Sequence, residues 1–143
     1  MEELSKLDIC AVSNLISTRE VSAVEVTQIA VKRAQELQPS INAFIQLEAD
    51  AALEAAEVID GIIKNGDRVG PLAGVPLAHK DMFYREGKVT TCGSKIRSQF
   101  KSDRTSTALD RLSRAGAVYL GGLNMSEFAV GPIGNNVHYG DCH

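Results

Sequence analysis

Three ionisable residues, His79, Lys80 and Asp81, follow directly on a short apolar run at residues 75–78. Glycine and proline precede the run, which is typical of a buried strand bounded by turns. A lysine at the end of such a strand is unusual, because lysine is almost never fully buried unless it is paired or used chemically. On a strand, Lys80 would share a face with small apolar residues, where desolvation favours the neutral amine and allows it to act as a base.

A second polar cluster, Thr-Thr-Cys-Gly-Ser at residues 90–94, lies in a stretch without regular periodicity. A thiol in such a loop could be nucleophilic. Cys92 with His79 or His138 would then make a cysteine hydrolase, although no spacing rule fixes the geometry of these pairs. This interpretation remains an alternative to a lysine-based site.

Three motifs together resemble the amidase signature family. They are Gly-Val-Pro-Leu-Ala-His-Lys-Asp at residues 74–81, the Thr-Thr-Cys-Gly-Ser at 90–94, and Leu-Asn-Met-Ser-Glu-Phe-Ala at 123–129. The resemblance implies a Ser–cis-Ser–Lys triad in which Lys80 falls on the triad lysine. Both family serines would lie in a Gly/Ser-rich region beyond His143, so the chain would hold one third of the triad.

The resemblance also implies roles for individual residues. Lys80 would take a proton from the bridging serine, which in turn would activate the nucleophilic serine, and would then help to deliver a proton to the leaving nitrogen. Cys92 and Gly93 would shape the active site without a chemical step. Met125 would line the substrate pocket, with core filling as the alternative role.

The two neighbours of the lysine are open to more than one interpretation. Asp81 could bond backbone amides at the strand end, or it could pair with Lys80 and keep the amine charged, which would oppose base catalysis. His79 would point to the other side of the strand, and we expect it to be packed and hydrogen-bonded rather than catalytic.

Composition limits the classes of partner. The 143 residues carry a net charge of −3, so no broad basic surface calls for direct nucleic-acid binding or an anionic membrane. No apolar run is long enough to span a bilayer, and the N-terminus has no apolar signal core. Three widely spaced cysteines, Cys10, Cys92 and Cys142, favour free thiols in a reducing cytoplasm over a disulfide scaffold.

Neither a metal nor an organic cofactor is expected. His138, Cys142 and His143 could be metal ligands, but three groups near a chain end without a second cluster are a weak signal. The glycines of residues 121–122 and 131–134 fit no phosphate-binding pattern, because neither Gly-Lys-Ser/Thr nor Gly-x-Gly-x-x-Gly is present.

The fold expected is α/β. A helical front at 1–66 is followed at 70–143 by the start of a mixed β-sheet flanked by helices, in which a strand, a long crossover with a helix and a second strand form a parallel unit. The expected elements are helices at 8–16, 22–38 (ended by Pro39), 51–64 (capped by Asp50) and 107–116, strands at 41–47, 75–80 and 118–120, and a helical turn at 126–130.

The function implied by the resemblance is hydrolysis of a carboxamide C–N bond in a small-molecule substrate. The alternative within the family is the glutamine-hydrolysing amidase subunit of the glutamyl-tRNA amidotransferase, which works with partner subunits; a homo-oligomer is the other assembly expected. The alternative of another class is a truncated, non-catalytic chain with a structural or binding role. Because the chain ends in a loop, we expect the domain to continue past residue 143 and the chain alone to be inactive.

Overall fold

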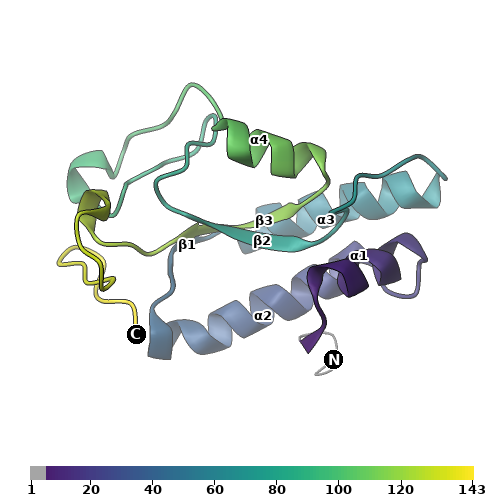
Figure 1. The fold of residues 1–143 in the computed structure, drawn as a ribbon, viewed down its shortest axis with the longest axis horizontal. Coiled ribbons are helices and arrows are strands. Elements are labelled where there is room, and N and C mark those ends of the chain that lie inside the picture. Colours follow the sequence, from purple (N-terminus) through teal and green to yellow (C-terminus); the bar gives the residue numbers. More distant parts are fainter. Residues whose placement is uncertain (1–5) are drawn as a thin grey trace. The chain divides into compact units, whose positions relative to one another are not determined.

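The computed structural model of the chain describes residues 6–143 (Figure 1). It contains the helices and strands α1 (Ile9–Ser17), α2 (Ala23–Ile41), β1 (Phe44–Leu47), α3 (Ala49–Lys64), β2 (Pro76–Lys80), α4 (Thr107–Arg114) and β3 (Val118–Leu123), with short 3-10 turns η2 (Lys95–Arg97) and η3 (Glu127–Ala129). The mixed sheet with flanking helices confirms the α/β class predicted from the sequence.

The first two helices begin where their capping residues predict. The side chain of Asp8 accepts a hydrogen bond from the amide of Ala11 at 2.8 Å. Ser22 and Glu25 form the reciprocal capping box, with Glu25 N donating to Ser22 Oγ at 3.0 Å and Ser22 N donating to Glu25 Oε2 at 2.9 Å. Each pair satisfies amides that would otherwise lack a partner at the helix N-terminus.

The prediction that Pro39 ends the second helix was wrong, because α2 continues to Ile41. Proline lacks the N–H that would bond the carbonyl four residues earlier, but this close to the helix end it removes a single bond. The amide of Asn42 still donates to Gln38 O at 2.9 Å. The helix therefore uses residue 41 that we had assigned to the following strand, and β1 begins only at Phe44.

The start of α3 also differs from the prediction. Its N-cap is Glu48, whose side chain makes no capping bond, and Asp50 lies inside the first turn rather than at the cap. A carboxylate in the first turn still interacts favourably with the helix dipole. The predicted end is confirmed, since Asn65 is the C-cap and Gly66 has a φ of 80°.

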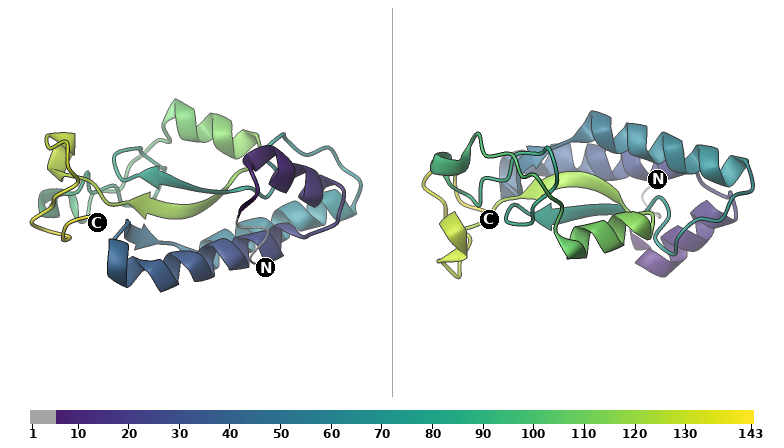
Figure 2. Two further views of the ribbon diagram at one scale, coloured as in Figure 1. Left: turned by 60° about the horizontal axis from the view of Figure 1, so that its bottom comes forward. Right: turned by 90° about the horizontal axis from the view of Figure 1, so that it is seen from above.

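The described residues form two compact units. The first lies within Met1–Ala34, Glu48–Leu77 and Arg111–Leu120, and the second comprises Gln35–Leu47, Ala78–Asp110 and Gly121–His143. In the first unit the strand segments lie between α2 and α3 on one side and the end of α4 on the other (Figure 2). Its interior is almost wholly apolar, with buried side chains that include Val12, Ile16, Val26, Val31, Ala52, Ala56, Ile63, Val75, Val118 and Leu120.

The three strands are ordered β1-β3-β2. β1 and β3 are antiparallel, with Leu47 opposite Gly121. β2 and β3 run parallel, because Val118 N donates to Val75 O at the start of the pair and Asp81 N donates to Leu123 O at its end. The predicted strand–helix–strand parallel unit is thus confirmed, and β3 extends three residues beyond the predicted strand.

The second unit has a different interior. Its buried residues are mainly polar: His79, Asp81, Thr90, Thr91, Ser94, Ser102, Ser126 and Asn136, together with Cys92, Leu109 and Met125. Buried polar groups must be hydrogen-bonded to be tolerated. This polar interior surrounds the end of β2, where the motifs found in the sequence converge.

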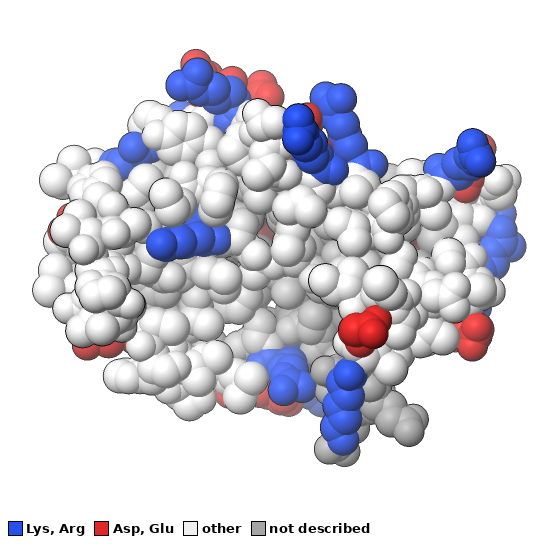
Figure 3. Space-filling model, in the orientation of Figure 1, with Lys and Arg blue, Asp and Glu red and all other residues white. Residues whose placement is uncertain are grey.

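Charged side chains are interspersed on the face of the molecule shown in Figure 3. Uncharged surface separates the scattered basic and acidic side chains. Within residues 6–143, we find no helix that is both long enough and apolar enough to cross a membrane.

Candidate active site

Lys80 is the last residue of β2, and its side chain is exposed within the described residues. The sequence had led us to expect an amine desolvated by its own strand face. That expectation was wrong for this part of the chain, because residues 6–143 leave the amine accessible.

Asp81, the next residue, is buried with 2% of its surface exposed. Its Oδ2 accepts a hydrogen bond from Thr91 N at 3.0 Å and another from Thr91 Oγ1, and its carbonyl accepts from Cys92 N at 2.9 Å. Burial raises the pKa of this carboxyl, against the opposing effect of the Thr91 hydrogen bonds. The prediction that Asp81 bonds nearby backbone amides is confirmed.

His79 is also buried, as predicted, with 9% of its surface exposed. Its Nδ1 lies 3.2 Å from Lys80 O. The ring is therefore part of the packed end of β2, consistent with a structural role.

The turn at residues 91–94 is held in an uncommon backbone conformation. Cys92 has a φ of 54° and Gly93 a φ of 71°. A left-handed conformation is unfavourable for a residue with a side chain and persists only where the surroundings enforce it. Here Thr91 Oγ1 accepts from Gly93 N at 3.0 Å, and Phe128 N donates to Cys92 O at 2.8 Å.

Cys92 itself is not arranged as a nucleophile. Burial raises the pKa of its thiol, which reduces the fraction of reactive thiolate near neutral pH. The histidine proposed as one partner, His138, directs its Nε2 to Glu127 Oε1 at 2.9 Å. The raised thiol pKa and the bond from His138 to Glu127 argue against a nucleophilic pair of Cys92 with His138.

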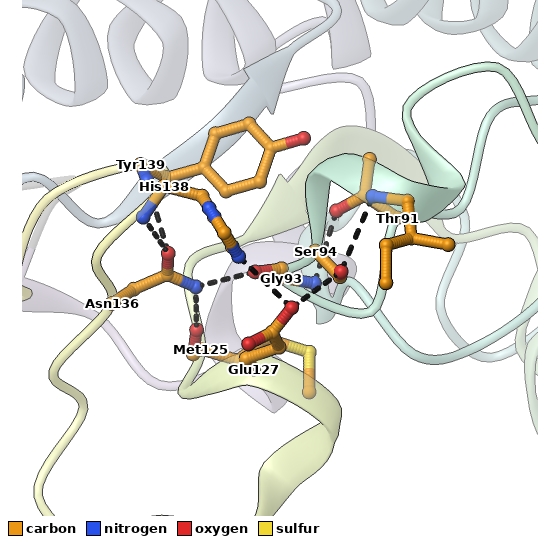
Figure 4. A network of polar contacts seen from close by, with 9 residues as sticks. Thr91, Gly93, Ser94, Met125, Glu127, Asn136, His138 and Tyr139 are labelled. Carbon is orange, nitrogen blue, oxygen red and sulfur yellow. Dashed lines mark hydrogen bonds and ion pairs between the residues drawn. The ribbon is translucent and has the colours of Figure 1, made fainter.

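Two polar segments far apart in the sequence meet at this turn (Figure 4). Asn136 Nδ2 donates to Gly93 O at 2.7 Å and to Met125 O at 2.6 Å. Glu127 Oε1 accepts from Ser94 Oγ at 2.5 Å as well as from His138. Hydrogen bonds from Ser94 and His138 lower the pKa of Glu127.

Met125 is buried, with 3% of its surface exposed, and lies against Gly93. The two residues predicted to shape a substrate pocket, Gly93 and Met125, are thus brought together by the fold. A neighbouring hollow of about 360 Å³ is lined by residues of the segment 126–137, including Ser126 and Glu127.

The sequence did not lead us to Ser126, Glu127 or Asn136 as site residues. Glu127 and Ser126 lie within a motif that we had noted as a whole, and Asn136 lies in a loop of glycine, proline and asparagine that resembles an ordinary turn. Glu127 and Asn136 make their hydrogen bonds to residues more than ten positions away, and no local pattern in the sequence signals such contacts.

The histidine and cysteine residues near the end of the chain do not converge on a metal site. In the described part of the chain, no three His, Cys, Asp or Glu side chains are arranged to hold a metal ion. Cys142 is exposed, and His138 bonds Glu127.

Comparison with known proteins identifies the family. A profile of the Amidase family matches residues 25–143. A glutamyl-tRNA(Gln) amidotransferase subunit from Aromatoleum aromaticum is 46% identical over 125 residues, 87% of this chain. The corresponding protein from Acidothermus cellulolyticus is 41% identical over 140 residues, 98% of the chain. The chain therefore belongs to the Amidase family.

Solved structures agree with this assignment. A peptide amidase in complex with the competitive inhibitor chymostatin superposes over 99% of this chain with a TM-score of 0.89 and 30% sequence identity. The chain spans only part of each relative: 25% of the Aromatoleum protein, 28% of the Acidothermus protein and 30% of the peptide amidase.

Proposed function

We propose that this chain is the N-terminal portion of a single amidase signature domain that hydrolyses a carboxamide C–N bond, with Lys80 as the general base. The observation that carries the proposal is the position of Lys80: it is the last residue of β2, beside the buried Asp81. Lysine can lose its proton when it is desolvated, so it can serve as a base where arginine cannot.

The surroundings of Lys80 support this role. The carboxylate of Asp81 accepts a hydrogen bond from Thr91 N. It therefore connects the end of β2 to the segment at residue 91. The amine is exposed in this part of the chain, and it would be desolvated when the rest of a longer domain and the substrate cover it. The serines of the triad and the backbone amides that stabilise the oxyanion would come from that further part.

Exposed apolar side chains of the second unit support the existence of a covering segment. Val130, Ile133 and Val137 are 85%, 75% and 89% exposed, and Ile96 is 86% exposed. Large apolar surface left open to water usually marks an interaction site. Under the proposal, the rest of a longer domain would cover these side chains; the chain spans 25% to 30% of the matched relatives.

We further propose that Met125, Cys92 and Gly93 contribute to the wall of the substrate pocket. The substrate would be a small-molecule amide, reached without direct contact to nucleic acid or membrane. The turn at 92–93 is fixed by bonds to Asp81 and Phe128, so it presents a rigid backbone surface near Lys80.

Substitution of Lys80 in the native product, meaning the polypeptide made from the native gene, tests the proposal. We expect Lys80→Ala to lower kcat/KM for ammonia release from primary amides about 10²- to 10⁴-fold. Lys80→Arg should be equally damaging, because guanidinium stays protonated. Lys95→Ala, at an exposed lysine of η2, serves as the control, and full activity of Lys80→Ala would reject the proposal.

A second function is favoured by the sequence relatives, which are subunits of the glutamyl-tRNA(Gln) amidotransferase at 41% and 46% identity. In that case the substrate would be glutamine, and partner subunits would be required. Comparing glutamine with simple amides as substrates, and identifying the subunits that copurify from the native cytoplasm, separates this function from a free-standing amidase or a homo-oligomer.

The alternative of another class is a non-catalytic chain with a structural or binding role. The intact mass of the native product decides this. A product of 143 residues that melts cooperatively as a soluble monomer would favour it, whereas a longer product that loses activity on Lys80→Ala would exclude it.

A further inference from the structure

The carboxamide of Asn136 joins three separate stretches of the second unit (Figure 4). Asn136 is buried, with 4% of its surface exposed. Its Nδ2 donates to Gly93 O and Met125 O. Its Oδ1 accepts from His138 N at 2.8 Å and Tyr139 N at 3.0 Å. Both donors and both acceptor positions of the side chain are thus used.

The orientation of this carboxamide is dictated by its partners. Gly93 and Met125 offer carbonyl oxygens, which only accept, and His138 and Tyr139 offer N–H groups, which only donate. Rotating the amide by 180° would set oxygen against oxygen and nitrogen against nitrogen. Only a side chain with two donors at one end and an acceptor at the other fits here, which among the short side chains is asparagine.

The two carbonyls that Asn136 holds belong to residues in close contact. A Cβ atom at Gly93 would lie 2.7 Å from Met125 O and 2.8 Å from Asn136 Nδ2. These distances are shorter than a carbon atom tolerates without displacement of its neighbour. Gly93 therefore packs directly against Met125, and the carboxamide of Asn136 bridges the carbonyl groups of the two residues.

We infer that Asn136 is a positioning residue for the amide hydrolysis proposed above. The inference rests on that proposed function, since Gly93 and Met125 are two of its pocket residues. Asn136 does not touch the substrate; it fixes the distance between the two residues that do. Loss of its donors lets these residues move apart, which weakens substrate binding even when the protein stays folded.

The same carboxamide is connected to the strand that carries Lys80. Gly93 N donates to Thr91 Oγ1, and Thr91 N donates to Asp81 Oδ2. A displacement at Gly93 is thereby transmitted through two hydrogen bonds to the residue beside the base. Asn136 therefore orients the pocket wall relative to the catalytic lysine as well.

Three variants of the native product test the inference. Asn136→Asp keeps the size and the acceptor but replaces the two donors by an oxygen that faces two carbonyls. Asn136→Ala removes the two donors and the acceptor without placing an oxygen against the two carbonyls. Asn14→Ala removes an exposed asparagine of α1 and is the control for the loss of a carboxamide. We expect KM for the best primary amide to rise about tenfold in Asn136→Ala and at least as much in Asn136→Asp, with Asn14→Ala unchanged.

KM separates positioning from folding, because loss of folded protein lowers the apparent kcat and leaves KM unchanged. Hydrogen exchange supplies a second readout. The amide of Phe128, which bonds Cys92 O, should exchange at least about tenfold faster in Asn136→Ala as the segments loosen.

Each outcome decides the question. A wild-type KM in a folded Asn136→Asp or Asn136→Ala overturns the positioning role and leaves the proposed function standing. Failure of both variants to fold overturns it in favour of a purely structural role. A wild-type product that hydrolyses no amide overturns both the positioning role and the proposed function.

Discussion

The amide of Phe128 donates a hydrogen bond to the carbonyl of Cys92 at 2.8 Å, and both residues have positive φ, 50° and 54°. Each of these conformations is unfavourable for a residue with a side chain. They occur together because two segments more than thirty residues apart restrain one another. Strain of this kind is typical of functional sites, where the surrounding structure enforces a precise backbone shape.

Replacing Gly93 by alanine should destabilise this arrangement. Gly93 has a φ of 71°, and an added Cβ would approach Met125 O to 2.7 Å. We expect the free energy of unfolding to fall by about 1–3 kcal/mol. Urea unfolding of the native product measures it.

Gly61→Ala is the matched control for that substitution. Gly61 lies within α3 and has no neighbouring heavy atom within 4 Å of an added Cβ, so alanine should stabilise the protein by about 0.5–1 kcal/mol. Equal effects of the two substitutions would contradict the view that the turn at Gly93 is sterically closed.

The start of α2 depends on a carboxylate from α3. Asp60 Oδ1 accepts from Ala23 N at 2.7 Å, and Asp60 Oδ2 accepts from Val24 N at 3.1 Å. These amides lack partners within their own helix, and the negative charge also favours the helix N-terminus. We expect Asp60→Ala to cost about 0.5–2 kcal/mol in the free energy of unfolding.

Thermal or urea unfolding measures this cost against Asp67→Ala, which removes an exposed carboxylate after the end of α3. If the two aspartates gave the same small change, the capping role of Asp60 would be rejected.

The sequence predicted the elements whose signals are local. The Asp8 cap and the Ser22–Glu25 capping box place the first two helix starts correctly, because side chain and amide lie within one turn. The prediction that α2 ends at Pro39 was wrong, since one lost hydrogen bond near a helix end is tolerated. Likewise, Asp50 has cap chemistry but lies in the first turn of α3.

The candidate site was predictable only in part, for the same physical reason. Lys80 and Asp81 stand out because charge follows an apolar run. Asn136 contacts Gly93 over a separation of 43 residues, and no periodicity or turn rule connects such positions. The exposure of Lys80 could not be predicted either, because solvent access depends on which segments cover the strand end.

Asp81 should make the stability of the protein depend on pH. Burial raises the pKa of its carboxyl in the folded state, above the value of about 3.9 in an unfolded chain. The protonated form therefore favours folding: this contribution is fully present below about pH 3.9 and is lost as pH rises through the folded pKa. Asparagine cannot ionise, so the stability of Asp81→Asn should not fall in this way as the pH rises.

Unfolding free energies measured from pH 3 to 7 test this dependence. Asp103→Asn, at a side chain that is 95% exposed, should leave the wild-type profile unchanged. A profile for Asp81→Asn that runs parallel to wild type over the whole range would mean that the buried carboxyl is fully compensated by Thr91.

Glu127 should act in the opposite direction. Hydrogen bonds from Ser94 and then His138 lower the pKa of its carboxyl in the folded state, below the value of about 4.3 for an unfolded chain. The ionised form therefore favours folding: its contribution is fully present above about pH 4.3 and is lost as pH falls through the lowered folded pKa. Glutamine cannot ionise, so Glu127→Gln should not lose stability in this way on acidification. The difference in stability between wild type and Glu127→Gln should therefore shrink as the pH falls.

Glu57→Gln, on the exposed side of α3, is the control and should keep the wild-type profile. The stability difference between wild type and Glu127→Gln could instead stay constant from pH 6 to 3. That result would show that the Ser94 and His138 bonds do not favour the ionised carboxylate.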